Sequence, residues 1–344
     1  MSRLTSFFRI TVLWAVSVAG ILQLHGQRVV LNPQRYFPKT VPPGNYSGIT
    51  WLGGHRYAVV SDKSPTAGFY LMTILTDSLT GEIKHARVDS FLTSHHPNRD
   101  EEGICFFPHS HTIFTSGEAD NQVVEYDMHG HLTGRRLAVP DIFSSCYPNS
   151  SIESLTYNSK TRLFWMTSEQ TLRPDGPQPT LENQKGNLLR LQCFNDSLQP
   201  VSQYWYQSDS LCCVNKVGRS LLGVSGLAAL DDGHIVVLER EARITPSKIG
   251  SFVHVKLYAV RPSAQPESLA HPGGQPHPLH KRLLTEFTTR FNLTARSFAN
   301  YEGICHGPRL ADGSLLLLMV ADSQDQYGGY LHDYFRTVVI RHER

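Results

Sequence analysis

The chain has 344 residues, with 32 Lys and Arg against 30 Asp and Glu, so its formal net charge at pH 7 is only +2. A chain this close to neutral has no large positive field, which argues against nucleic acid or an anionic membrane surface as its partner. The length suits one large repeat-built domain or two ordinary domains.

The N-terminus has the layout of a secretory signal peptide. Arg3 and Arg9 flank a short positive region, and Ile10–Leu24 is an uncharged apolar run followed by small or polar residues. The run is shorter than the roughly 20 residues that span a bilayer, although a membrane anchor is the alternative interpretation. We therefore expect a signal peptide over residues 1–26, cleavage near Gly26, and a secreted or periplasmic protein with no integral membrane segment after cleavage.

Five segments of the mature chain share one frame. Each opens with a small or acidic residue before Gly or Ser, continues as an apolar strand, turns, and ends a second apolar strand at an acid. The segments are Asn45–Lys63, Asp100–Asp120, Asn149–Gln170, Gly223–Glu241 and Asn300–Asp325. Their spacing of roughly 50 to 77 residues suits one four-stranded propeller blade per repeat. The sequence therefore predicts an all-β fold, a single β-propeller domain over residues 27–344 around a central channel.

We expect six blades of four strands each. Five repeats are visible, and the long intervals between Ser154, Gly226 and Gly303 leave room for one further, degenerate blade. The ring is expected to close by pairing Arg28–Leu31 with the C-terminal strand Phe335–Arg341, which removes exposed sheet edges.

The repeats predict where polar side chains gather. The innermost strand of each blade lines the channel, so the equivalent residues Glu102, Glu153 and Glu302 should converge from three blades, and the glycines beside two of them allow close backbone approach. Acids that end the second strands are expected to join them at the channel mouth. These acids are Asp62, Glu118, Glu169, Glu239 and Asp322.

Carboxylates gathered in this way repel one another, so they need either raised pKa values or a bound cation. Hard oxygen ligands favour calcium, and after it magnesium, over zinc. We expect Glu102, Glu153 and Glu302 to hold such an ion. Lys63 and Arg240, each directly after a ring acid, would bind an anionic substrate, and the amides near three segment openings would assist them. These amides are Asn45, Asn149 and Asn300.

Other interpretations stay open. In the structural alternative, the acids only pair with backbone amides and basic neighbours and so tie the blades together. Lys63 and Arg240 then serve as surface or salt-bridge residues. The six cysteines either form disulfides or remain buried thiols, and their spacing does not suit zinc. The segment around Ser225 lacks the second glycine of a G-x-S-x-G nucleophile elbow. The proline-rich stretch Arg261–Arg282 is expected to be a surface loop.

The order of motifs resembles the phytase-like esterase domain family. It runs S-G-I then S-D-K, D-E-E-G-I then S-G-E, N-S-S-I-E-S-L then S-E-Q-T-L, S-G-L-A-A-L then L-E-R-E, and N-Y-E-G-I then A-D. The resemblance covers about Asn45 to Ile340 and implies an exported β-propeller that hydrolyses phosphate or other esters. It carries over a set of recurring polar positions: Asp100, Glu102, Glu153, Glu239, Arg240, Asn300, Glu302 and Asp322.

Taken together, the residues and the resemblance predict a monomeric, metal-dependent hydrolase of a small anionic ester, with a phosphoester as the expected substrate. Calcium held by the three channel glutamates would polarise the ester, Glu102 would take part in catalysis, and Glu239 or Asp322 would act as general base. Lys63, Arg240, Asn149 and Asn300 would bind the substrate. The alternative is a non-catalytic propeller that binds a ligand or partner and uses calcium only structurally. A lactonase-like or sugar-oxidising propeller is a third option.

Overall fold

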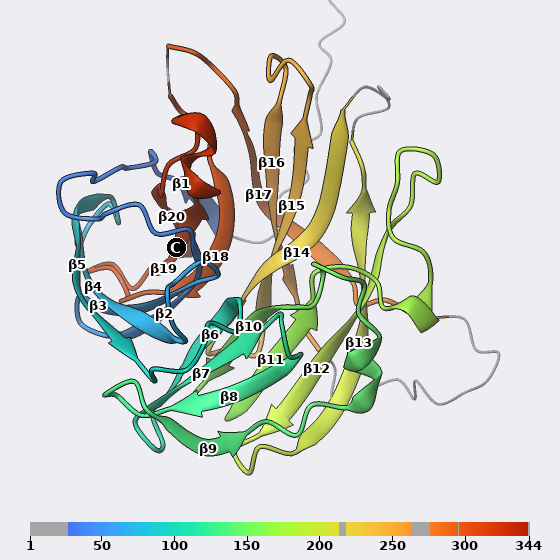
Figure 1. Cartoon of the computed structure of the whole chain (residues 1–344). Coiled ribbons are helices and arrows are strands. Elements are labelled where there is room, and N and C mark those ends of the chain that lie inside the picture. Colours follow the sequence, from blue (N-terminus) through green and yellow to red (C-terminus); the bar gives the residue numbers. More distant parts are fainter. Residues whose placement is uncertain (1–26, 213–217, 263–275, 295, 343–344) are drawn as a thin grey trace, which may run out of the picture.

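The computed structural model describes residues 27–212, 218–262, 276–294 and 296–342, so the expected signal peptide lies outside the described residues. Within these ranges the chain forms five four-stranded antiparallel sheets. Figure 1 shows them arranged as the blades of a propeller around a common centre. The prediction of an all-β, single β-propeller is confirmed.

Each blade is a meander in which consecutive strands pair from the centre outward. Blade 1 contains β2 (Tyr46–Gly53), β3 (Arg56–Ser61), β4 (Gly68–Thr76) and β5 (Ile83–Thr93). Blade 2 contains β6 (Glu101–Phe107), β7 (Thr112–Gly117), β8 (Gln122–Tyr126) and β9 (Leu132–Arg136). Blade 3 contains β10 (Ile152–Asn158), β11 (Leu163–Ser168), β12 (Gly186–Asn195) and β13 (Pro200–Ser210).

Blades 4 and 5 complete the ring. Blade 4 contains β14 (Arg219–Ala229), β15 (Ile235–Ile244), β16 (Phe252–Val260) and β17 (Lys281–Arg290). Blade 5 contains β18 (Asn300–His306), β19 (Leu315–Asp322), β20 (Phe335–His342) and, from the other end of the chain, β1 (Gln27–Leu31). Short 3-10 helices lie at Asp141–Ser145, Arg173–Asp175 and Asp325–Gly328. None of the helices in the described ranges is long and apolar enough to cross a membrane.

The predicted closure of the ring is confirmed. Strand β1 pairs antiparallel with β20, with Arg28 opposite Arg341 and Leu31 opposite Val338. The N-terminal strand therefore becomes the outermost strand of the last blade. This pairing covers the edge that β20 would otherwise leave open.

The prediction of six blades is wrong, because the described residues form five. The interval from Ser154 to Gly226 is taken up by the long strands β12 and β13 and by the connection that precedes them. The interval from Gly226 to Gly303 is taken up by β15, β16 and β17 and by the proline-rich connection between β16 and β17. The extra length thus extends existing blades, and residues 263–275 of that connection lie outside the described residues.

The core lies between neighbouring blades, where the faces of adjacent sheets pack together. Phe107 and Phe114 of blade 2 contact Phe164 of blade 3, with ring centroids 5.0 and 5.1 Å from it. A further apolar cluster joins blades 4 and 5, where Leu238 and Leu257 pack with Met319. Strands buried on both faces explain why the repeats read as nearly continuous apolar runs.

The glycines of the two E-G-I-C segments lie where the innermost strands approach one another. A Cβ on Gly103 of β6 would lie 2.6 Å from the backbone nitrogen of Leu155 on β10, and one on Gly303 of β18 would lie 2.7 Å from the carbonyl oxygen of Ser47 on β2. Both contacts are too short for a side chain. The repeated tetrapeptide therefore marks equivalent inner-strand positions of two blades, as the repeat predicted.

Four of the six cysteines, Cys105, Cys146, Cys193 and Cys305, are free thiols. Cys105, Cys193 and Cys305 are buried and Cys146 is partly buried. Burial raises the pKa of the Cys146 thiol to about 11 and that of Cys193 to about 12. For these four residues, the buried-thiol interpretation holds.

Candidate functional site

Five equivalent residues of the inner strands form a ring at the centre of the propeller. Each lies at a break in the pairing between the first and second strands of its blade, for example between Ile152 and Ser154 and between Tyr301 and Gly303. The ring residues are Ser47, Glu102, Glu153, Ser225 and Glu302. A β-bulge releases a residue from the ladder and re-aims its side chain. Glu102, Glu153 and Glu302 are directed toward the mouth in this way, whereas the hydroxyls of Ser47 and Ser225 donate to backbone carbonyls of the next blade.

A second ring lies on the second strand of each blade. On each of these strands, one residue pairs with the last first-strand residue before the bulge, and the ring member is the residue that follows it. In blade 2, Glu101 pairs with Gly117, and Glu118 follows Gly117 in the chain. In blade 4, Val224 pairs with Glu239, and Arg240 follows Glu239. The second ring is Asp62, Glu118, Glu169, Arg240 and Asp322. Four blades thus supply an acid at this position, and blade 4 supplies an arginine.

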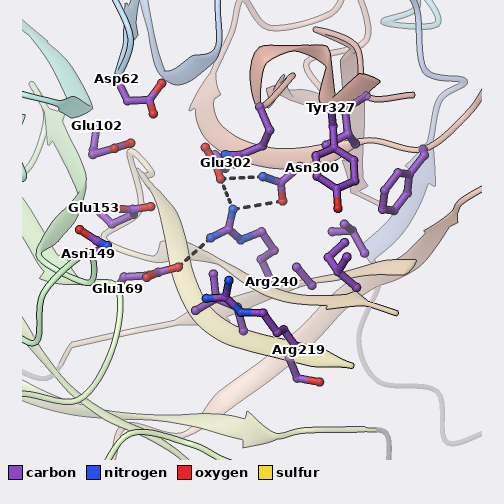
Figure 2. A pocket seen from close by; sticks show the side chains of 18 of the residues that line it. Asp62, Glu102, Asn149, Glu153, Glu169, Arg219, Arg240, Asn300, Glu302 and Tyr327 are labelled. Atoms are coloured by element: carbon purple, nitrogen blue, oxygen red, sulfur yellow. Dashed lines mark hydrogen bonds and ion pairs between the residues drawn. The ribbon is translucent and has the colours of Figure 1, made fainter. Parts of the chain in front are cut away.

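Seven of these ten ring residues, all except Ser47, Ser225 and Asp322, line a pocket of about 480 Å³ at one end of the channel. Figure 2 shows Asp62, Glu102, Glu153 and Glu169 on one side of it, with Arg240, Asn300 and Glu302 in the middle. The predicted convergence of Glu102, Glu153 and Glu302 from three blades is present in the structure.

Arg240 binds the acids of two neighbouring blades. Its Nη2 donates to Oε1 of Glu169 over 2.7 Å, and its Nη1 donates to Oε1 of Glu302 and to Oδ1 of Asn300, the latter over 3.1 Å. Asn300 in turn donates from Nδ2 to the same Glu302 oxygen over 2.8 Å. Burial disfavours the arginine's charge, but Glu302, Glu169 and Glu153 outweigh burial and raise its pKa. Arg240 is therefore a buried cation that is already paired.

Glu102 and Glu153 differ from Glu302, because within the described ranges no hydrogen bond reaches either side chain. Burial, and then repulsion by neighbouring carboxylates, raises the pKa of both well above the ordinary glutamate value. Burial also raises the pKa of Glu302, but the charge of Arg240 opposes it and leaves the value at about 7. The mouth thus holds carboxyl groups that favour the neutral form beside one that ionises near neutrality.

The structure places the remaining predicted residues at different depths. Lys63 does not line the pocket but lies beside it next to Asp62, 56% exposed, with its Nζ 2.7 Å from Oδ2 of Asp62 and 3.8 Å from Oδ1 of Asp100. Asn149 is exposed and lines the pocket. Asp322 is buried at the end of β19, where its carboxylate accepts hydrogen bonds from Gln324.

The placement of Glu239 at the mouth is a correction to the sequence prediction. Its side chain points to the opposite face of β15, where Tyr206 and Lys281 donate to Oε1 over 2.5 and 2.7 Å. Neighbouring residues on a strand point to opposite faces, so Glu239 and Arg240 cannot both reach the channel. Arg240 takes the mouth, and Glu239 ties blade 4 to blade 3.

The fit of a metal ion can be judged from the donors themselves. Their hard oxygen chemistry suits calcium or magnesium, and Oδ1 of Asp62 is buried without a hydrogen-bond partner among the described residues. Yet among the residues that the structure describes, no three Asp, Glu, His or Cys side chains come together as a group that could hold a metal ion. The described residues thus show no formed metal centre, and calcium at Glu102, Glu153 and Glu302 stays a prediction.

Sequence reasoning missed the other half of the pocket. Arg219 lines it as an exposed cation at the start of β14, and apolar residues from blades 4 and 5 line the side away from the acids, among them Leu221, Val253 and Phe298. The repeat could not reveal them, because these positions have no counterpart in the shared frame.

The comparisons with known proteins agree with the repeat. A family model described as "Phytase-like: Esterase-like activity of phytase" matches residues 41–324. No curated protein matches the sequence. The match to the family model spans the five inner-strand positions Gly48, Gly103, Ser154, Gly226 and Gly303 and nearly the whole mouth.

Several solved structures resemble the fold at low identity. Hydrazine synthase from Kuenenia stuttgartiensis is 9% identical with a TM-score of 0.38, and the match covers 83% of this chain and 78% of that one. A member of the duf4221 family from Bacteroides vulgatus is 8% identical with a TM-score of 0.42, covering 92% and 98%. A protein of unknown function from Bacteroides thetaiotaomicron is 12% identical with a TM-score of 0.37, covering 92% and 76%. The family model, which spans most of the sequence, places this chain in the Phytase-like family.

Proposed function

We propose that this chain hydrolyses a small anionic ester, with a phosphoester as the first choice, in the mouth pocket of the propeller. The observation that supports it is the coexistence of two kinds of carboxyl group at one mouth. Glu302 is paired with Arg240 and has a pKa of about 7, whereas Glu102 and Glu153 are buried without such a partner and have strongly raised pKa values. Carboxyls with separated pKa values can serve as base and acid in one reaction.

In this mechanism Glu302 is the general base. Its Oε1 is held by Arg240 and Asn300, while no described residue hydrogen bonds to its Oε2. The free oxygen accepts a proton from water as the water oxygen bonds to the phosphorus or carbonyl carbon of the ester. Glu102 or Glu153, in the neutral form, donates a proton to the leaving alcohol oxygen as the ester bond breaks. Asn149 and Lys63 at the rim would hold the substrate, and Asp322 would orient the loop beside Glu302.

We also propose that the protein binds calcium at the mouth. A calcium ion that arrives with an anionic ester would offset the charge of both, and Glu102, Glu153 and Glu302 would be its ligands after side-chain movement. No step above depends on it. We further propose that the chain acts outside the cell or in the periplasm, which the N-terminal pattern of residues 1–26 supports.

The test is hydrolysis of aryl phosphates and aryl carboxylates by the mature protein, with calcium and with chelator. We expect turnover that falls at least 100-fold in Glu302→Gln, within the range of rate factors for a general base. Glu286→Gln is the matched control, since Glu286 is 50 % exposed on the outer strand β17 and lies outside the pocket. No turnover of any ester, or equal turnover in Glu302→Gln, contradicts the proposal.

One observation favours a second candidate, a propeller that binds a ligand without turnover. The only buried cation among the described pocket-lining residues, Arg240, is already engaged by Glu169, Glu302 and Asn300 and is not available to stabilise a developing negative charge. Saturable binding of an ester that is recovered intact would support this candidate.

A further inference from the structure

We infer that the mouth pocket is built for an amphiphilic ester, in which a small polar ester head is joined to an apolar aryl or alkyl group. This inference rests on the proposed function for the identity of the head, and it adds the substrate class. It follows from the division of the pocket into two chemically different walls.

The polar wall comes from blades 1, 2 and 3. Its members are Asp62, Glu102, Glu118, Asn149, Glu153 and Glu169. The opposite wall comes from blades 4 and 5 and from the loop that follows β19. Its members are Leu221, Ala242, Ile244, Val253, Phe298 and Leu331. Figure 2 shows Tyr327 on this side, across from the acids, with Arg240 and Glu302 between the two walls.

The apolar wall has a buried base and a more exposed front: Val253, Phe298 and Leu331 are only 2–4% exposed, so most of its exposed area comes from Leu221 and from the half-buried Ala242 and Ile244. Val253, Phe298 and Leu331 belong to the apolar cluster that joins blades 4 and 5, so these side chains are fixed in place. Leu221 lines the same pocket and is 37% exposed. An apolar group that covers this wall removes it from water, and the gain grows with the area covered. A ligand made of hydroxyl and phosphate groups alone would leave this apolar wall exposed to water.

The head group has a cation and donors available. Arg219 lines the pocket and makes no hydrogen bond or ion pair with the described residues, so its guanidinium can take an anionic oxygen. Neutral carboxyls on the polar wall add O–H donors. A volume of about 480 Å³ lies within the range of small-ligand sites, roughly 300–1,000 Å³. A ring alcohol with many phosphates would instead set charges against the apolar wall, so the geometry points away from such a polyanion.

The experiment compares two phosphomonoesters that share the head and differ in the body, 1-naphthyl phosphate and glycerol 2-phosphate. Binding is measured by calorimetry at 4 °C, before significant turnover, with the mature protein and with Leu221→Gln. We expect naphthyl phosphate to bind at least about tenfold more tightly, and Leu221→Gln to weaken it by about tenfold while leaving glycerol phosphate unchanged, because even one methylene in an apolar pocket changes affinity by roughly that factor. Val201→Gln is the control, an apolar residue 54% exposed on β13 outside this pocket.

Equal affinity for the two esters, no binding of either, or no effect of Leu221→Gln overturns the inference. Its failure differs from failure of the proposed function. Tight binding of naphthyl phosphate with no release of naphthol supports the amphiphilic pocket and contradicts hydrolysis. Hydrolysis without any preference for the apolar body supports the proposed function and contradicts the amphiphilic pocket.

Discussion

Arg240 of blade 4 donates from Nη2 to Oε1 of Glu169 in blade 3 over 2.7 Å, and both side chains are almost fully buried. At the register position of Arg240, the other four blades carry an acid. One arginine in a ring of carboxylates thus neutralises part of their charge. It also joins blade 4 to blade 3 through Glu169 and to blade 5 through Glu302.

Removing this cation should be costly. Arg240→Met leaves Glu169 and Glu302 buried without their partner, and we expect the free energy of unfolding to fall by about 3–5 kcal/mol, as for other broken buried ion pairs. Urea denaturation measures it. Arg87→Met, a surface arginine 57% exposed, is the control and should change stability by less than about 1 kcal/mol. A loss in Arg240→Met as small as that of the control would show that the acids are protonated without the arginine.

The acid ring should make stability depend on pH. The folded-state pKa of Glu302, about 7, lies above that of an ordinary glutamate, so between the two values the folded state binds more protons than the unfolded state. Stability therefore falls as pH rises through this window, and we expect a loss of about 2 kcal/mol between pH 5 and pH 8.

Denaturant titrations at a series of pH values test this dependence. Glu102→Gln removes a second carboxyl group whose folded-state pKa is raised and should flatten the decline, whereas the outer-strand variant Glu286→Gln should keep it. A protein that gains stability between pH 5 and pH 8 would contradict the assignment of raised pKa values to the mouth.

Asn45 should hold the loop beside the mouth. Its Oδ1 accepts from Oγ of Ser323 and from the backbone nitrogen of Asp325, and its Nδ2 donates to Oδ1 of Asp325 over 2.7 Å. Residues 324–327 all have positive φ, so this loop depends on outside contacts. In Asn45→Ala we expect hydrogen exchange at 324–329 to become at least about tenfold faster, since a lost bond is worth roughly 1–3 kcal/mol when a buried partner is left unsatisfied.

The control for that measurement is Asn183→Ala. The side chain of Asn183 also makes three local hydrogen bonds, but in the loop that precedes β12. Its loss should leave exchange at 324–329 unchanged. If Asn45→Ala changes exchange no more than Asn183→Ala does, the loop is held by other contacts.

The inner-strand glycines should tolerate no side chain. Gly103→Ala sets a Cβ 2.6 Å from the Leu155 backbone nitrogen and 2.7 Å from Oγ of Ser116, so neighbouring inner strands must move apart. We expect a loss of about 1–3 kcal/mol or more, as in other overpacked cores. Gly307→Ala is the comparison, because the atom nearest to its added Cβ is the hydroxyl oxygen of Tyr57 at 3.1 Å. Thermal unfolding of both variants should show the larger drop in Gly103→Ala.

Much of the fold could be predicted from the sequence, because it depends on short local patterns of residues. A propeller blade is a chain of short strands and turns, and its repeat places the same apolar and glycine pattern in every blade, so Gly103 and Gly303 already mark equivalent inner-strand positions. The closing pair β1 and β20 was also predictable, because an open edge at the end of a ring must be covered. Blade number was not, since long strands and an extra blade occupy the same length of chain.

The candidate site divides in the same way. The sequence by itself determined that Glu102, Glu153 and Glu302 occupy one repeated position, because the repeat fixes them. Only the tertiary structure decided that bulges aim these side chains at the mouth, that Glu239 points away while Arg240 points in, and that an apolar wall faces the acids. The first two depend on strand register, where a shift of one residue reverses the face. The wall depends on contacts between blades 4 and 5, whose residues lie far apart in the chain.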